Sequence, residues 1–347
     1  MIKPKHLEKG DAVAIVSLSS GILGEDWAIH KLGIARERLE RDYGLRVRVM
    51  PNALKGVDHL DRHPEARASD LMEAFRDPEI RAVFSAIGGD DTIRLLPYID
   101  FDVLRENPKI FTGFSDTTSN HMMMYKAGLC SYYGASVMTN FAEYVRINDY
   151  TARMIRDTLF EPKPTLEIPS SPYWYDDEDE KIWWKEENIH TLRQYHPEEI
   201  GYEILQGAGA VEGELLGGCL DVFIELTGTP LWPSLDDWRG KILFLETSEE
   251  DMSAGLLTWI LRNLAAQGIF DAVNGILVGK PARRSKYEPY KEVYRSVVGR
   301  EAGRPDLPIL YNVNFGHAEP RGVLPIGVRA RLDADNKRLT LLESATA

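Results

Sequence analysis

Ser115 is the residue whose surroundings most suggest chemistry. A short β-prone run, Ile110 to Thr112, precedes Gly113, and residues 117–126 favour a helix. A strand, a sharp turn and a helix with serine at the turn is the geometry of a nucleophile elbow, in which the hydroxyl is exposed. Free backbone N–H groups at the start of such a helix suit a developing oxyanion. Thr117 stands where the usual pattern has glycine, so an ordinary turn or helix cap fits the same residues.

A serine nucleophile needs a nearby base, and the base needs an orienting acid. Of the eight histidines, His317 directly follows a predicted strand (309–315) and Gly316. Glu246 ends the apolar run 242–245, where a buried carboxylate requires a partner. Each residue also has a purely structural interpretation. His317 can be a packed histidine, and Glu246 can be a helix-capping carboxylate. The order Ser, acid, His matches that of α/β-hydrolases, but spacing alone does not bring three side chains together.

A glycine pair supplies the remaining requirement of acyl transfer. Gly88 and Gly89 follow another predicted strand, and the backbone N–H groups of Gly89 and Asp116 are our candidates for an oxyanion hole. The pair suits a tight strand-to-helix turn equally well. Asp90 and Asp91 lack further ligands at metal-binding spacing, so we predict no metal site here.

The elements that position these residues alternate regularly. Strands and helices follow one another from Gly10 to Gly134, which predicts an α/β fold with a parallel sheet covered on both faces. We expect a helix to start at residues 92–99 and a closing β-ribbon at residues 328–342. Loops at the carboxyl ends of such strands carry function. We place a first domain at residues 1–160, a proline-, aromatic- and acid-rich connection at 161–206, and a second domain with the acid and the histidine at 207–347.

Composition excludes several partners. The chain has 347 residues and a formal charge of −13, which argues against a nucleic-acid polymer or an anionic membrane. Cys130 and Cys219 are the only cysteines and lie far apart in sequence, as expected in a reducing compartment. No apolar stretch is long enough to span a bilayer, so we expect a cytoplasmic protein.

The two adjacent tryptophans in the connection have two possible roles. An exposed indole at Trp183 or Trp184 can stack on a nucleobase, which contributes about 1–3 kcal/mol per base. Alternatively, one of the two anchors the connection to the body of the protein or to a partner subunit.

Four blocks together resemble the LD-carboxypeptidase family of serine peptidases. They are residues 86–100 with Gly-Gly-Asp-Asp, residues 108–116 with Gly-Phe-Ser-Asp, Gly217-Gly218 with Leu243 to Glu246, and Asn314 to His317 with Leu324 to Gly327. The resemblance implies Ser115 as nucleophile, His317 as general base and acid, Glu246 as orienting acid, and the amides of Gly89 and Asp116 as oxyanion hole. It also implies a Rossmann-like N-terminal domain, a C-terminal domain with β-barrel character and a homodimer, without metal or cofactor.

Within this family the sequence is more similar to the microcin C immunity branch, whose members cleave aminoacyl-nucleotide toxins, than to enzymes that trim murein tetrapeptides. Two positions near the substrate depart from the family pattern. Cys219 replaces an asparagine after the paired glycines, and Glu250 lies where the immunity branch commonly has a lysine. We therefore expect the chemistry to be retained and the ligand to differ.

Three functions follow from these patterns. We expect a serine hydrolase that cleaves aminoacyl-nucleotide amides, a small-molecule substrate. The alternatives are a murein LD-carboxypeptidase acting on a short peptide, for which Arg94 and Arg321 are candidate carboxylate partners, and a non-catalytic binding module. An amidotransferase is disfavoured, because neither cysteine occupies the elbow.

Overall fold

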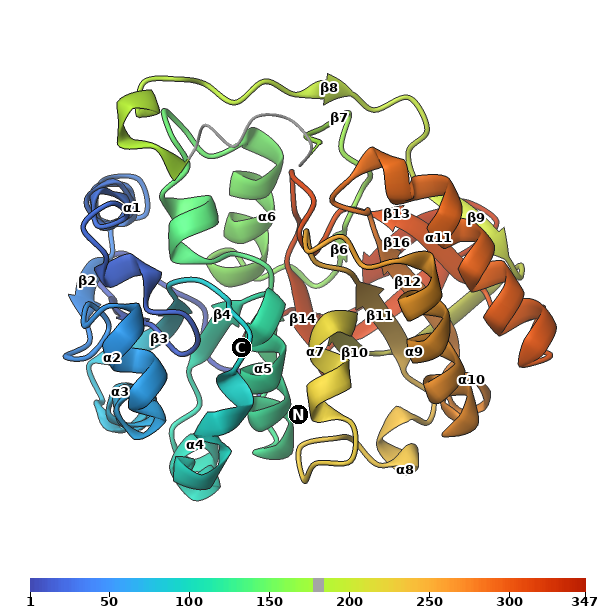
Figure 1. Ribbon diagram of the computed structural model, residues 1–347, viewed down its shortest axis with the longest axis horizontal. Coiled ribbons are helices and arrows are strands. Elements are labelled where there is room, and N and C mark those ends of the chain that lie inside the picture. The colour runs from blue at the N-terminus through green and yellow to red at the C-terminus, as the bar shows by residue number, and fades with distance from the viewer. Residues whose placement is uncertain (177–183) are drawn as a thin grey trace. The chain divides into compact units, whose positions relative to one another are not determined.

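The computed structural model describes residues 1–176 and 184–347, and the chain forms two compact units (Figure 1). The first unit comprises Met1–Pro162, Lys181–Gln194 and Ala345–Ala347. The second comprises Lys163–Glu180 and Tyr195–Ser344. Each unit contains pieces that are distant in sequence.

Parallel strands in the order β5-β4-β3-β1-β2 form the sheet of the first unit. All five residues of β1 are apolar and buried, the pattern of a central parallel strand. The carboxyl ends of β1, β3 and β4 are neighbours, so the loops that follow them share one edge. The strands are β1 (Ala12–Val16), β2 (Arg46–Val49), β3 (Ile80–Ser85), β4 (Ile110–Gly113) and β5 (Ser131–Tyr133).

Helices connect these strands, as parallel pairing requires. Pro64 begins α3 and Lys126 ends α5, placements that suit a helix start and a helix end. Short 3-10 helices accompany them, including η2 (Thr92–Tyr98) and η3 (Ser115–Thr117). The α-helices are α1 (His30–Arg41), α2 (Val57–Arg62), α3 (Pro64–Arg76), α4 (Phe101–Glu106), α5 (Thr118–Lys126) and α6 (Asp149–Leu159).

The sheet of the second unit is mixed, in the order β6-β16-β15-β10-β11-β12-β13-β9. Its long strand β10 pairs in parallel with β11 through Leu215–Cys219 and antiparallel with β15 through Ala210–Glu214. The strands of this unit are β6 (Leu166–Glu167), β7 (Tyr173–Trp174), β8 (His196–Pro197), β9 (Glu203–Gln206), β10 (Ala210–Cys219), β11 (Ile242–Glu246), β12 (Gly275–Gly279), β13 (Ile309–Val313), β14 (Leu324–Ile326), β15 (Arg329–Asp333) and β16 (Arg338–Leu341).

The helices of the second unit pack beside this sheet, and α9 lies next to α11 (Figure 1). Ser253 caps α9 by accepting a hydrogen bond from the amide of Leu256, 3.1 Å away. The helices are α7 (Leu220–Leu226), α8 (Leu235–Trp238), α9 (Ala254–Ala266), α10 (Ile269–Ala272) and α11 (Tyr287–Tyr294).

The predicted fold class is confirmed, because both units combine helices with a sheet that contains parallel strands. The closing ribbon expected at residues 328–342 is the antiparallel pair β15 and β16. A helix lies where one was expected from Thr92, and it is the 3-10 helix η2, with Pro97 inside it. Proline lacks the backbone N–H that a regular α-helix would use there.

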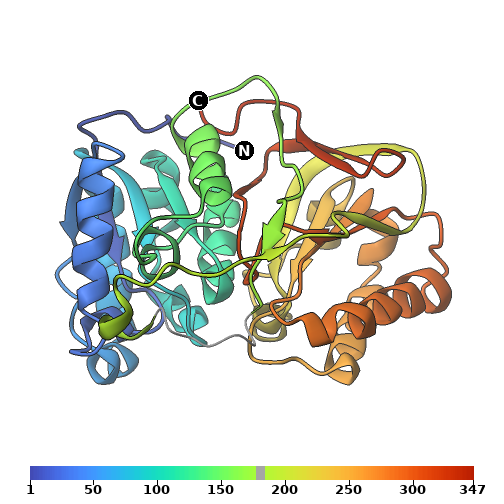
Figure 2. The ribbon, with the colours of Figure 1, turned by 90° about the horizontal axis from the view of Figure 1, so that it is seen from above.

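The last three residues return to the first unit, beside the start of the chain (Figure 2). The amide of Ala347 donates to the Pro4 carbonyl at 2.9 Å, and the Tyr132 hydroxyl donates to the Ala345 carbonyl at 2.9 Å. The two ends of the chain are therefore held together by hydrogen bonds.

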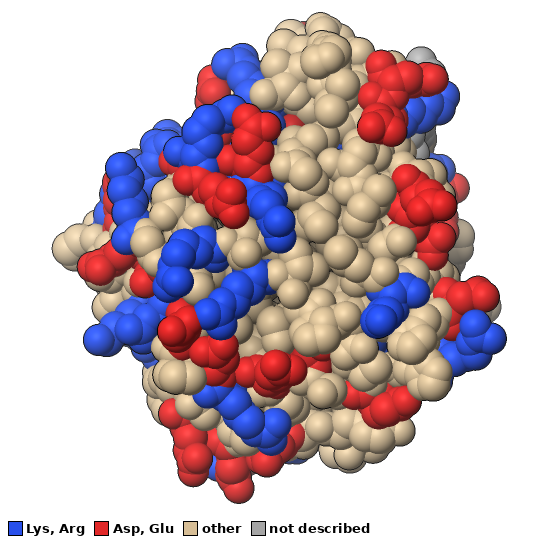
Figure 3. All heavy atoms as spheres, turned by 90° about the vertical axis from the view of Figure 1, so that its left-hand side faces the viewer, with Lys and Arg blue, Asp and Glu red and all other residues tan. Residues whose placement is uncertain are grey.

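Charged side chains of both signs are interspersed on the face shown in Figure 3. Ion pairs are frequent among the charged residues that the structure describes, such as Arg41 with Glu37 at 2.6 Å and Arg48 with Asp77 at 2.6 Å. Among the described residues, none of the helices combines the length and the apolar character that crossing a bilayer requires.

Candidate functional site

Ser115 lies at a strained turn between β4 and α5. Its φ is +66°, a left-handed conformation that serine rarely adopts, and its side chain is half-buried. The Ser115 amide donates to the Tyr133 hydroxyl at 3.1 Å. Strain of this kind persists only where the surroundings enforce it, and it is typical of functional turns.

Gly88 lies directly against this serine. A Cβ at Gly88 would be 2.8 Å from Ser115 Cβ and 2.9 Å from Ser115 Oγ, so only glycine fits. The same position is 3.4 Å from the Asp116 amide nitrogen. Gly89 has a φ of +154°, and a Cβ there would overlap Ser19 Oγ. The first unit thus brings the glycine pair, Ser115 and the Asp116 amide together.

The side chain of Asp116 organises this edge of the sheet, which the sequence did not indicate. Its Oδ2 accepts hydrogen bonds from the Asp91 amide at 3.0 Å, the Thr92 amide at 2.9 Å, the Thr92 hydroxyl at 2.6 Å and the Ser19 hydroxyl. Burial raises the pKa of Asp116, whereas the bonds from Ser19 and Thr92 lower it. One carboxylate therefore joins the loops after β1, β3 and β4.

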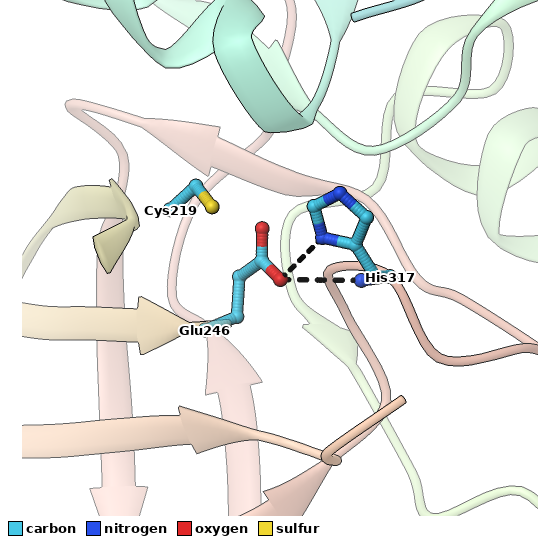
Figure 4. A group of neighbouring side chains, drawn as sticks. All are labelled: Cys219, Glu246 and His317. Atoms are coloured by element: carbon cyan, nitrogen blue, oxygen red, sulfur yellow. Dashed lines mark hydrogen bonds and ion pairs between the residues drawn. The ribbon is translucent and has the colours of Figure 1, made fainter. Parts of the chain in front are cut away.

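Glu246 and His317 meet in the second unit (Figure 4). Glu246 Oε2 accepts a hydrogen bond from His317 Nδ1 at 2.7 Å and one from the His317 amide at 3.2 Å. The two side chains are only 1% and 7% exposed. Gly316, with a φ of +87°, permits this approach, since a Cβ there would be 2.6 Å from Glu246 Oε2. The carboxylate fixes the orientation of the imidazole, as an orienting acid does.

The other imidazole nitrogen has a second carboxylate beside it. Glu249 Oε2 is 3.2 Å from His317 Nε2, and the Glu249 side chain is 39% exposed. Burial, the largest influence, disfavours the charged imidazole, but Glu246 and then Glu249 outweigh it and raise the pKa of His317 to about 9. Sequence reasoning missed Glu249, although it follows Glu246 by three residues.

Cys219 lies at the end of β10, next to Glu246 on β11. Its buried thiol donates to Asp221 Oδ2 at 3.3 Å, and burial raises the pKa of the thiol well above its usual value. Among the described residues, the ligand atoms of Cys219, Glu246 and His317 lie within 4.8 Å of one another, as in a metal site. However, His317 Nδ1 is already engaged in the hydrogen bond to Glu246.

Trp184 packs on the body of the first unit. Its ring centroid is 6.1 Å from that of Trp27 at an interplanar angle of 64°, and Lys31 Nζ is 5.8 Å from its ring. Further along the segment, Arg193 forms a buried ion pair with Glu143 at 2.7 Å. Trp183, the other tryptophan considered for stacking, lies outside the described residues.

The two arginine candidates, and a buried histidine of the first unit, have structural partners. Arg94 is bound to Asp91 at 2.7 Å and to Asp61 at 2.9 Å, and the buried Arg321 pairs with Glu319 at 3.0 Å. His121 is buried behind the elbow, where its ring nitrogens contact Ser131 Oγ and the Gly113 carbonyl. Burial lowers the pKa of His121 to about 4, so it is neutral at pH 7.

The chain matches two family models. The LD-carboxypeptidase N-terminal domain matches residues 13–134, and the LD-carboxypeptidase C-terminal domain matches residues 212–332. The first range includes Ser115, and the second includes Glu246 and His317.

Relatives of this chain carry names from both branches of this family. The microcin C7 self-immunity protein MccF of Escherichia coli is 29% identical over 80% of this chain and 78% of its own. A probable murein peptide carboxypeptidase of Bacillus subtilis is 30% identical over 96% and 92%.

Solved structures agree over nearly the whole length. An MccF-like protein from Streptococcus pneumoniae in complex with AMP aligns with a TM-score of 0.86 and 37% identity over 96% of this chain and 98% of its own. MccF in complex with aspartyl sulfamoyl adenosine aligns with a TM-score of 0.85 and 26% identity over 100% of both chains. This chain belongs to the LD-carboxypeptidase family and is a serine peptidase.

Proposed function

We propose that this peptidase hydrolyses aminoacyl-nucleotide amides with a Ser115–His317–Glu246 triad. The observation that carries the proposal is the buried hydrogen bond from His317 Nδ1 to Glu246, 2.7 Å long, which orients the imidazole as a general base. The strained turn at Ser115 and the backbone amides beside it supply the nucleophile and the oxyanion donors. The proposal assigns Ser115 of the first unit and the Glu246–His317 pair of the second unit to one reaction.

The reaction would pass through an acyl-enzyme. Ser115 Oγ attacks the scissile carbonyl while His317 Nε2 takes its proton, and Glu246 stabilises the resulting imidazolium. The amides of Gly89 and Asp116 donate hydrogen bonds to the oxyanion. His317 then gives the proton to the leaving nitrogen, the amide bond breaks, and a water activated by His317 releases the acyl group.

The nucleotide part of the proposal is supported by the ligands of the relatives. MccF was solved with aspartyl sulfamoyl adenosine, and the Streptococcus pneumoniae protein with AMP. In this chain Trp183 and Trp184 are the candidates for stacking on the base. Trp184 contacts Trp27 and Lys31, which favours the anchoring interpretation for this residue.

The test compares two substrates with one enzyme preparation. Wild-type protein is incubated with an aminoacyl sulfamoyl adenosine and, separately, with an L,D-tetrapeptide, and the products are separated by liquid chromatography. We expect cleavage of the nucleoside amide, reduced about 10³-fold or more in Ser115→Ala. Cleavage of the tetrapeptide alone would establish the murein alternative instead, which the Bacillus subtilis relative favours.

A serine-directed fluorophosphonate separates an enzyme from a binding module. We expect labelling of the wild type, none in Ser115→Ala, and slower labelling in His317→Ala, because the histidine activates the hydroxyl. An unlabelled wild type would favour a non-catalytic role.

A further inference from the structure

A cavity of about 480 Å³ lies within the second unit. Its wall comes from β7, β8 and the loop after β8, from the residues that follow β12, from β13 and from the start of α11. Every described residue that lines it belongs to this unit, and the proposed triad is not part of the wall. The apolar part of the wall includes Pro197, Ile200 and Pro281. The volume is in the range of small-molecule sites.

Asn312, at the wall of this cavity, has a strained backbone and an unsatisfied side chain. Its φ is +67°, and the residue is only 1% exposed. Its Nδ2 donates to the Gly201 carbonyl at 2.7 Å, which fixes the orientation of the amide because a carbonyl can only accept. Its Oδ1 is buried and accepts a hydrogen bond from no described residue. Because a buried oxygen without a donor is costly, this position suits a ligand that brings an N–H group.

The three acids of the cavity wall differ in what they bind. Glu198 is buried, pairs with the buried Lys280 and also accepts hydrogen bonds from two backbone amides at 2.9 Å and 3.2 Å. Glu288 pairs with Lys291 at 3.1 Å. Glu199 is exposed, and no ion pair joins it to another described residue. The wall therefore offers one carboxylate, that of Glu199, to a cationic group of a ligand.

Two adjacent arginines supply positive charge to the same cavity. Arg283 lies 3.5 Å from Asp251, and its buried Nε donates to no described residue. The guanidinium carbon of Arg284 is 5.9 Å from the centre of the Trp174 ring, and no ion pair joins this arginine to another described residue. A ring face holds a cation in place without neutralising its charge. The wall thus also offers donors and a positive charge to a carboxylate.

We propose that this cavity binds a small zwitterion, either a free amino acid or a short peptide that carries both terminal charges. Asn312 Oδ1 and Glu199 bind the ammonium group, and Arg283 and Arg284 bind the carboxylate. A simple anion would leave Asn312 Oδ1 without a donor, and a simple cation would leave Arg284 unpaired. Hydrolysis of a peptide bond releases molecules of this class, so the site is independent of which substrate the peptidase cleaves.

The experiment titrates four probes into the full chain by isothermal calorimetry. L-Phenylalanine carries both charges, N-acetyl-L-phenylalanine lacks the ammonium group, and L-phenylalaninamide lacks the carboxylate. The dipeptide L-alanyl-L-phenylalanine carries both charges at a larger separation. Every protein in the series also carries Ser115→Ala, so that no probe is hydrolysed during the titration.

The test variants are Arg284→Gln and Glu199→Gln, both at exposed positions where the fold should be retained. Arg300→Gln and Glu292→Gln are the matched controls, because these residues form an exposed ion pair at 2.6 Å outside the cavity wall. Each control makes the same charge change as one test variant, elsewhere in the second unit.

We expect the unsubstituted cavity to bind a probe with both charges about tenfold more tightly than either blocked probe, as for a lost charge-assisted contact. Arg284→Gln should weaken L-phenylalanine about tenfold and leave the amide within about twofold. Glu199→Gln should do the same for L-phenylalanine and the N-acetyl probe, because a charge already missing from the ligand cannot be lost again. Both controls should bind every probe as the unsubstituted cavity does.

The dipeptide distinguishes the two sources of the zwitterion. Tighter binding of L-alanyl-L-phenylalanine would identify a short peptide as the occupant, and tighter binding of L-phenylalanine a free amino acid. No binding of either, equal binding of charged and blocked probes, or binding that neither test variant weakens would overturn the proposal. None of these results bears on cleavage by the proposed triad, which is measured separately.

Discussion

At the scale of single residues, the candidate site depends on groups held in costly states. Ser115 has a left-handed backbone conformation, and His317 is buried between two carboxylates. Such strain and charge burial must be offset by neighbouring contacts. The hydrogen bonds from His317 to Glu246 and from Ser115 to Tyr133 are among the contacts that do so.

The pH dependence of activity should reflect His317. Its pKa is raised to about 9, above the ordinary value of 6.5, and a general base must be neutral. We therefore expect kcat/KM to rise with pH up to about 9. Measurement of kcat/KM between pH 6 and 10 tests this, and a plateau already reached at pH 7 would contradict it.

The raised pKa of His317 also makes the free energy of unfolding depend on pH. Because the folded protein binds this proton more tightly than the unfolded chain, the stabilisation is fully present below pH 6.5 and is lost as the pH rises through about 9. Urea unfolding of the wild type and of His317→Gln should therefore differ more at pH 6 than at pH 9.5. An equal difference at both pH values would contradict the assignment.

The side chain of Asp116, and not only its backbone amide, should be required for the stability of the fold. In Asp116→Ala the donors of Ser19, Asp91 and Thr92 lose their common acceptor, and we expect a loss of about 3 kcal/mol in the free energy of unfolding. Asp116→Asn keeps one acceptor oxygen and should lose about 1 kcal/mol. Urea denaturation of the two variants measures both values, and equal losses would exclude an acceptor role.

At the scale of elements, the site is built where strands end. Ser115, Gly88 and Gly89 follow β4 and β3, while Cys219 and Glu246 end β10 and β11. Parallel pairing brings these ends to a common edge in each unit, which is why loops distant in sequence can cooperate.

Gly88 should tolerate no side chain. In Gly88→Ala the new methyl group would lie 2.8–2.9 Å from Cβ and Oγ of Ser115, so we expect a loss of activity of about 10²-fold or more through displacement of the nucleophile. The control is Gly33→Ala on the exposed face of α1, where nothing lies within 4 Å. It should raise stability by about 0.5–1 kcal/mol and leave activity unchanged. Steady-state kinetics and thermal unfolding of both variants provide the measurement.

The segment that carries Trp184 should depend on one buried ion pair. Glu143→Gln leaves Arg193 without its carboxylate at a buried position, which costs about 3–5 kcal/mol. We expect faster hydrogen exchange in residues 184–194 than in the wild type. Arg146→Gln, which removes an exposed cation 3.7 Å from Asp149, should leave that exchange unchanged. Equal exchange in Glu143→Gln and the wild type would show that other contacts hold the segment.

The alternating strands of the first unit could be predicted from the sequence, because buried apolar runs and alternation are local signals. The strand before Ser115 is an example, and the closing ribbon of the second unit was predicted in the same way. The short strands β6, β7, β8 and β9, which lie in the stretch interpreted as a connection, could not. The Asp116 hydrogen bonds and the contact of Glu249 with His317 could not be predicted. They join residues through loop conformations, and loop conformation has no periodic signature. The glycines at positions 88, 89 and 316 indicated turns in the sequence. The sequence did not show which neighbouring side chain each glycine makes room for.

At the scale of the whole molecule, the proposed triad has members in both units. Ser115 belongs to the first, and Glu246 and His317 belong to the second. A substrate analogue that contacts all three would bind only the folded protein and would stabilise it.

Thermal unfolding of Ser115→Ala with an aminoacyl sulfamoyl adenosine should show this stabilisation. At about 100 times the Kd, the ligand adds about 2.7 kcal/mol to the free energy of unfolding. We expect a higher midpoint temperature with this ligand than with adenosine alone. No difference between the two ligands would show that the aminoacyl part makes no useful contact.

The first unit is assembled from three separate stretches of chain, the last of which is only Ala345–Ala347. No single cut in the polypeptide can therefore release this unit intact. A hybrid of two relatives joined at residue 162 would take residues 1–162 of this unit from one parent and its C-terminal residues 345–347 from the other. The hydrogen bonds that join residues 345–347 to Pro4 and Tyr132 would then form between residues from different parents. A chimera of two family members should fold only when all three stretches of the first unit come from the same parent.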